Sequence, residues 1–141
     1  MENLQFDSGI KTYCINGSGT LRFHPGDPNL YQRFLEAVEK IQAVEQQLQE
    51  DLNGENVQLL QCMSTADGHI KQVLNWVFGP GNDFHQILEG VNLLAVADNG
   101  QRVITNLFEA LEPVLTEGAR TCARQQAQAA VRKAEQRRSQ Q

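Results

Sequence analysis

The sequence has no apolar run long enough to cross a membrane and no recognisable signal peptide. A membrane-spanning helix needs about 18 or more consecutive apolar residues, and no such run occurs among the 141 residues. The first seven residues, MENLQFD, lack the basic segment and the apolar core of a secretory signal. We therefore expect no membrane segment and a cytoplasmic location.

Cysteine and histidine are too few and too scattered to form a disulfide framework or a metal site. The chain has three of each: Cys14, Cys62, Cys122, His24, His69 and His85. An odd number of widely spaced cysteines argues against disulfides and favours reduced thiols. No Cys-x-x-Cys or His-x-x-x-His spacing occurs, so no zinc-binding pattern is present.

Catalytic motifs are also missing. Cys62 and His69 share a predicted helix face, but two helical turns separate them and no organising Asp or Asn is evident. The Gly79-Pro80-Gly81 segment is no phosphate loop, because Gly-Lys-Ser/Thr does not follow it. We therefore expect a protein that is not an enzyme, with no catalytic, cofactor-binding or metal-binding residues and no cofactor.

The composition fits one soluble domain with a largely aliphatic core. Aromatic residues are only 6% of the chain, whereas glutamine is unusually common, with 17 residues. A chain of this length can bury about two-thirds of its surface, which is enough for a real core. The abundance of glutamine favours long exposed helices over a compact enzyme.

Charge is distributed unevenly along the chain. Residues 119–141 hold six basic residues against one acid, a net charge of +5, which leaves −10 for residues 1–118. This asymmetry suggests self-association or a charged protein partner. The overall acidity and the lack of aromatic residues in the basic segment argue against nucleic-acid binding.

The N-terminal part of the chain predicts a β-hairpin over residues 9–25. Two runs of β-formers flank Asn16-Gly17-Ser18-Gly19, a strong turn signal because Asn and Gly tolerate positive φ. A lone two-stranded hairpin is marginal in water. We expect it to pack on helices or to lend its edges to another chain.

Two amphipathic helices follow. The first is predicted from Pro28 to about Leu52, with Asp27 as its N-cap. Its apolar positions are Leu30, Phe34, Ala37, Ile41, Val44 and Leu48. Those of the second helix are Leu59, Met63, Ala66, Ile70, Val73 and Val77. Both sets repeat at spacings of four and three, which predicts two facing seams in an antiparallel helical hairpin. The Asp67-Gly68 pair falls on the face opposite the second seam, so it need not break that helix.

The remaining elements are a short helix and a long final helix. A stop at residues 78–83 precedes one or two helical turns closed by Gly90, and residues 91–97 are expected to be a buried connector. The final helix is predicted to begin near Asp98 or Asn99, and Pro113 should kink or end it. Gly118 should weaken it further.

The predicted fold class is therefore mainly α (α+β): an N-terminal β-hairpin, an antiparallel helical hairpin and a long C-terminal helix. We predict two parts, a single helical domain over residues 1–118 and a basic Gln/Ala/Arg-rich helical tail over residues 119–141. The tail has good helix propensity and little apolar surface, so we expect it to protrude and to fray at its end.

Three segments resemble a known group of proteins. They are Val77-Phe78-Gly79-Pro80-Gly81-Asn82, Ile87-Leu88-Glu89-Gly90 and Val103-Ile104-Thr105-Asn106-Leu107-Phe108-Glu109-Ala110-Leu111-Glu112-Pro113. Together with the 15–27 segment they resemble tail-assembly chaperones from phages and prophages of Gram-positive bacteria. The resemblance covers roughly residues 10–115 and leaves out the basic tail.

The resemblance implies a non-enzymatic tail-morphogenesis protein that binds the tape-measure protein, or the tail-tube protein, in the bacterial cytoplasm. Such chaperones coat the long, aggregation-prone tape measure until tube subunits polymerise around it. The implied protein works as a homo-oligomer. Two alternatives stay open: a structural tail-completion or connector protein of the virion, and a helical DNA-binding regulator.

Overall fold

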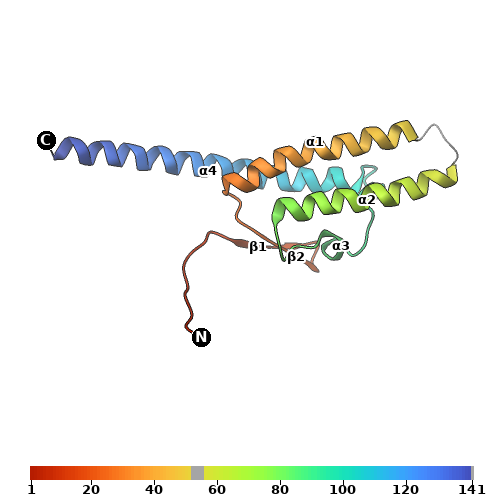
Figure 1. Ribbon diagram of the computed structural model, residues 1–141, viewed down its shortest axis with the longest axis horizontal. Helices are drawn as coiled ribbons and strands as arrows, with labels where there is room; N and C mark the ends of the chain where they lie inside the picture. Colours follow the sequence, from red (N-terminus) through yellow and green to blue (C-terminus); the bar gives the residue numbers. More distant parts are fainter. Residues whose placement is uncertain (52–55, 141) are drawn as a thin grey trace.

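The fold is mainly α-helical, with one β-hairpin at the N-terminal end (Figure 1). The computed structural model describes residues 1–51 and 56–140. Its elements are β1 (Lys11–Ile15), β2 (Gly19–Phe23), α1 (Pro28–Asp51), α2 (Asn56–Phe78), α3 (Phe84–Ile87) and α4 (Val103–Ser139). The order of these elements confirms the predicted architecture.

The β-hairpin forms where the turn signal predicts it. β1 and β2 pair antiparallel, and Asn16 and Gly17 between them have φ values of 52° and 79°. Leu21 and Phe23 point to one side of β2 and are fully buried. The Phe23 ring stacks on Tyr13 of β1 at 4.8 Å and meets Phe78 of α2 edge-on at 5.0 Å. The hairpin is thus packed on the helices through its apolar face.

The predicted helical hairpin is present. α1 and α2 run antiparallel side by side (Figure 1), and α1 starts at Pro28 with the Asp27 carboxylate accepting from the Asn29 N–H at 3.0 Å. The α1 seam is buried except for Val44, which is half-buried. In the α2 seam, Leu59, Met63 and Val73 are half-buried and the other three residues are buried in the same core.

Asp67 corrects the prediction for α2. Its side chain is predicted on the face opposite the seam, and that face is also buried here, since Asp67 is only 9% exposed. α2 packs against α1 on one side and against α3 and the connector on another, so a single apolar seam does not describe its buried surface. Gly68 is exposed and does not break the helix.

The segment between α2 and α4 forms a stop, a short helix and a connector in the predicted order. Asp83 caps α3 by accepting from the His85 N–H at 3.0 Å. In the connector, Leu93 and Leu94 are buried, but Val91 and Val96 are exposed. The expectation of a wholly buried connector is therefore correct only for its centre.

α4 starts and continues differently from the prediction. It begins at Val103 rather than near residue 98, because the Asn99 side chain accepts from the Gln101 N–H and bonds to Asn106 instead of capping a helix. Pro113 neither ends nor interrupts it. Pro113 is exposed, so the carbonyl that loses its N–H partner can be solvated.

The first third of α4 belongs to the core and the rest leaves it (Figure 1). Its buried residues are Ile104, Leu107, Leu111 and Leu115. Phe108 also meets Phe34 of α1 edge-on, at 5.7 Å between ring centroids. From residue 123 to residue 140 every side chain is exposed.

Gly118 marks the place where α4 leaves the body. A Cβ atom at this position would lie 1.9 Å from the Pro25 carbonyl oxygen. The backbone after β2 therefore crosses α4 so closely that only glycine fits. Gly118 was expected to weaken the helix, but its structural role is this backbone contact.

None of the helices in the described part of the chain is long and apolar enough to span a membrane.

Candidate protein-binding surfaces

The titratable and nucleophilic side chains do not gather into a site among the described residues. No group of three or more His, Cys, Asp or Glu residues there could hold a metal ion. His24 and His85 are each engaged locally, His24 Nδ1 accepting from the Gly26 N–H at 2.9 Å and His85 Nδ1 lying 3.2 Å from Lys71 Nζ. Cys14 is exposed, whereas Cys62 and Cys122 are half-buried, and all three are free thiols.

One polar cluster is buried, and its role is structural. Lys71 is 4% exposed and pairs with the Asp67 carboxylate at 2.9 Å. The other Asp67 oxygen accepts from the Leu93 N–H at 2.8 Å. The cluster therefore ties α2 to α3 through His85 and to the connector through Leu93. Sequence reasoning missed it, although the spacing of Asp67 and Lys71 (i, i+4) is that of a helical ion pair.

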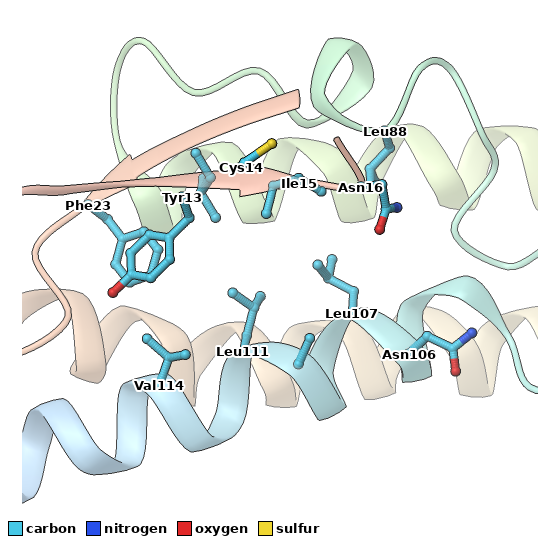
Figure 2. Close-up of a pocket in the computed structure, with 12 residues that line it drawn as sticks. Tyr13, Cys14, Ile15, Asn16, Phe23, Leu88, Asn106, Leu107, Leu111 and Val114 are labelled. Carbon is cyan, nitrogen blue, oxygen red and sulfur yellow. The ribbon is translucent and has the colours of Figure 1, made fainter. Parts of the chain in front are cut away.

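A first apolar groove separates the hairpin from α4. Figure 2 shows Tyr13 and Ile15 facing Leu107, Leu111 and Val114 across an open space. The groove measures about 320 Å³. We call this the hairpin groove. Most of its lining is aliphatic or aromatic, so it offers a surface for apolar side chains rather than for a charged ligand.

The two edges of the β-hairpin differ. On the outer edge of β2, Asn82 accepts from the Arg22 N–H at 3.0 Å and donates to the Arg22 carbonyl at 2.8 Å. Asn82 is only 8% exposed and also donates to the Phe78 carbonyl at 3.0 Å. This side chain occupies the place that a further strand would take, so the β2 edge is closed to strand pairing at Arg22.

The edge of β1 is open. Arg22 is paired with Thr12 across the hairpin. Because both backbone groups of Arg22 bond to Asn82, the N–H and C=O of Thr12 must point away from β2, and those of Cys14 follow by alternation. Both residues are exposed, and none of the residues described by the structure hydrogen-bonds to this edge.

A second groove, of about 630 Å³, lies between α1 and α2 near the end where the two helices are joined. We call this the helical groove. Leu48 and Ala66 are buried at its base. The described lining is Ala43, Val44, Gln47, Leu48, Gln58, Gln61, Cys62, Thr65, Ala66 and His69. It carries no carboxylate, lysine or arginine, although charged residues are 21% of the chain.

The helical groove contains both Cys62 and His69, which the sequence predicts on one helix face without the further partner of a catalytic pair. They line the same groove from positions seven residues apart on α2. The described lining combines an apolar floor, Leu48 and Ala66, with the amide side chains of several glutamines, and such a surface suits an amphipathic helix.

No protein-family model, no curated protein and no solved structure matches the chain.

Proposed function

We propose that the protein is a non-enzymatic tail-assembly chaperone of a phage or prophage, and that the helical groove binds helical segments of the tape-measure protein. The observation that carries the proposal is the groove between α1 and α2, whose described lining has an apolar floor and no Asp, Glu, Lys or Arg. A chaperone for a long amphipathic helix needs such a surface, because helix-in-groove recognition relies on apolar anchors. The sequence resemblance supplies the identity of the client.

The charges of the chain support the same function. Residues 1–118 carry a net charge of −10, which would keep a complex with an aggregation-prone client in solution. A tape measure is long, so several copies must bind along it. The protein would therefore act as a homo-oligomer in the cytoplasm of the bacterial host, with the tail-tube protein as a second candidate partner.

The test introduces charge into the helical groove. Gln61 and Thr65 line the groove and are exposed, so the pair Gln61→Glu and Thr65→Glu changes its chemistry without removing core atoms. Ser64 and Gln72 are exposed on the same helix but do not line the groove. The variant Ser64→Glu with Gln72→Glu is therefore the matched control, with the same two added carboxylates.

Each variant is co-expressed with the tape-measure protein encoded in the same tail-gene region. We expect the control to keep the tape measure soluble as well as the natural protein does. The groove variant should lose at least about tenfold of the soluble complex, because a carboxylate buried against an apolar helix is strongly unfavourable. Equal solubility with both variants would contradict the assignment of the client to this groove.

A further inference from the structure

The N-terminal arm, residues 1–10, carries several large apolar side chains that are exposed in the described part of the chain. Leu4 is 91% exposed, Phe6 is 84% exposed and Ile10 is 50% exposed. In Figure 1 the arm leads away from the body of the protein. Fully exposed large apolar side chains on an extended segment indicate an interaction site when they occur together.

The arm has the sequence pattern of a half-buried strand. Leu4 and Phe6 alternate with Asn3, Gln5 and Asp7. This two-residue period would place both apolar side chains on one face and the polar ones on the other. The arm is thus suited to pair with a sheet edge that has an apolar surface beneath it.

The open edge of β1 offers that combination. The outward N–H and C=O groups of Thr12 and Cys14 are available for strand pairing, while Asn82 blocks the other edge of the hairpin. Tyr13 and Ile15 point from β1 into the hairpin groove (Figure 2). Residues directly opposite each other on paired strands share a face. A strand added here with Phe6 opposite Tyr13 would therefore direct Phe6 and Leu4 into the groove.

We propose that the arm of a second copy of this chain adds to the β1 edge and inserts Leu4 and Phe6 into the hairpin groove, with the exchange being reciprocal. The chain's own arm is poorly placed for this. To pair with its own β1, the arm would have to reverse direction at residues 8–10. This reversal would disturb the close packing of Gly9 on His24, where a Cβ at Gly9 would lie only 2.5 Å from the imidazole ring. A second copy meets no such restriction.

Charge and symmetry favour the same occupant. The arm carries two carboxylates, Glu2 and Asp7, and the β1 strand that would receive it begins with Lys11. If the arm of each copy pairs antiparallel with β1 of the other copy, the two contacts are related by a two-fold axis. Both arms are then buried in one closed dimer. Each arm then contributes a Phe and a Leu, and the buried area doubles relative to a single docked arm. This inference does not rest on the chaperone function and uses a different groove.

The first test measures the mass of the full-length protein in solution. We expect about twice 15.8 kDa for the natural protein at micromolar concentration. The variant Leu4→Ser with Phe6→Ser changes only exposed side chains and should raise the dimer dissociation constant at least about tenfold. A natural protein of 15.8 kDa throughout this range, or a variant that associates equally well, would overturn the proposal.

The second test identifies the occupant with a disulfide. If Phe6 lies opposite Tyr13, Gln5 lies opposite Cys14, which is exposed and within the range that a disulfide can bridge. In a Cys62→Ser and Cys122→Ser background, one chain carries Gln5→Cys with Cys14→Ser and a second, longer-tagged chain keeps Cys14. Oxidation of the mixture should give a linked heterodimer.

Two results of this experiment would contradict the proposal. One is the absence of the heterodimer, or a yield no higher than that of the control Gln128→Cys, which is exposed on the far part of α4. The other is efficient closure within one chain when Gln5→Cys and Cys14 are present together, since that would make the chain's own arm the occupant.

Discussion

The two parts of α4 belong to one continuous helix but are held in place by different forces. Residues 103–118 bury Ile104, Leu107, Leu111 and Leu115 at spacings of three and four. Residues 119–139 continue with the same backbone geometry, yet all side chains beyond Cys122 are exposed. The first part is stabilised by packing, whereas the second depends on the helix propensity of Ala, Gln and Arg. Continuous secondary structure therefore does not indicate a continuous core.

The largest expected difference between the two parts comes from truncating one apolar side chain in each. Leu115 is 1% exposed and Val131 is 57% exposed. Leu115→Ala should lower the free energy of unfolding by about 2–5 kcal/mol, and Val131→Ala should change it by no more than about 0.5 kcal/mol. Urea denaturation measures both. Similar losses for the two variants would show that the far part of α4 is packed as well.

The boundary between the two parts can be tested at Gly118. A Cβ at Gly118 would lie 1.9 Å from the Pro25 carbonyl oxygen, so Gly118→Ala should destabilise by about 1–3 kcal/mol through overpacking. Gly68 of α2 has nothing within 4 Å of the corresponding position. The control Gly68→Ala should therefore stabilise by up to about 1 kcal/mol. If both variants increased the free energy of unfolding, the result would contradict the close contact between Gly118 of α4 and the backbone of Pro25.

A smaller effect is expected for the ion pair that bridges the boundary. Arg124 donates to Glu117 at 3.1 Å, but the two side chains are 68% and 62% exposed. An exposed pair contributes little because solvent screens it, so Arg124→Ala should cost less than about 0.5 kcal/mol. If chemical denaturation showed that the free energy of unfolding falls by well above 1 kcal/mol, the ion pair would be shielded from solvent. The part of α4 around Arg124 would then be packed against other residues.

The smallest effect on stability is expected when the second part is removed. Truncation after Gly118 should shift the melting temperature of a dilute sample by no more than about 2 °C, equivalent to about 0.5 kcal/mol. The same truncation removes a net charge of +5 and should weaken association with acidic partners. This loss should be greatest at low salt, because salt screens exposed charges. Calorimetry and light scattering at two salt concentrations measure both effects; a large drop in melting temperature would contradict the comparison.

Local sequence signals predicted the elements well where one residue type determines the backbone. Asn16-Gly17 determined the hairpin turn, and Asp27 with Pro28 determined the start of α1. The same reasoning failed at Asn99, whose side chain bonds within its own turn and to Asn106 rather than capping a helix. Local patterns cannot distinguish these two uses of an asparagine, because both satisfy nearby backbone donors.

Features that depend on tertiary contacts were not predictable. From the sequence alone, Gly118 is a residue that weakens a helix, but in the structure it allows the close contact with the Pro25 backbone. Asp67 has the sequence pattern of a surface acid, but in the structure it is bonded to Lys71 and to the Leu93 N–H. The two grooves have the same origin. Each groove is formed between two different elements, so the apolar pattern predicted core positions without indicating which of them would remain open.

The central proposal is that the protein binds the tape measure during tail assembly, and a chaperone with this role would leave before the tail is complete. The most direct test is quantitative mass spectrometry of tape-measure complexes purified before tail completion and of finished particles. The account predicts several copies of this protein per tape measure in the early complexes and none in the finished particles. Its absence from the early complexes, or its retention at a fixed copy number in finished particles, would contradict the account, and retention would identify a structural component of the virion.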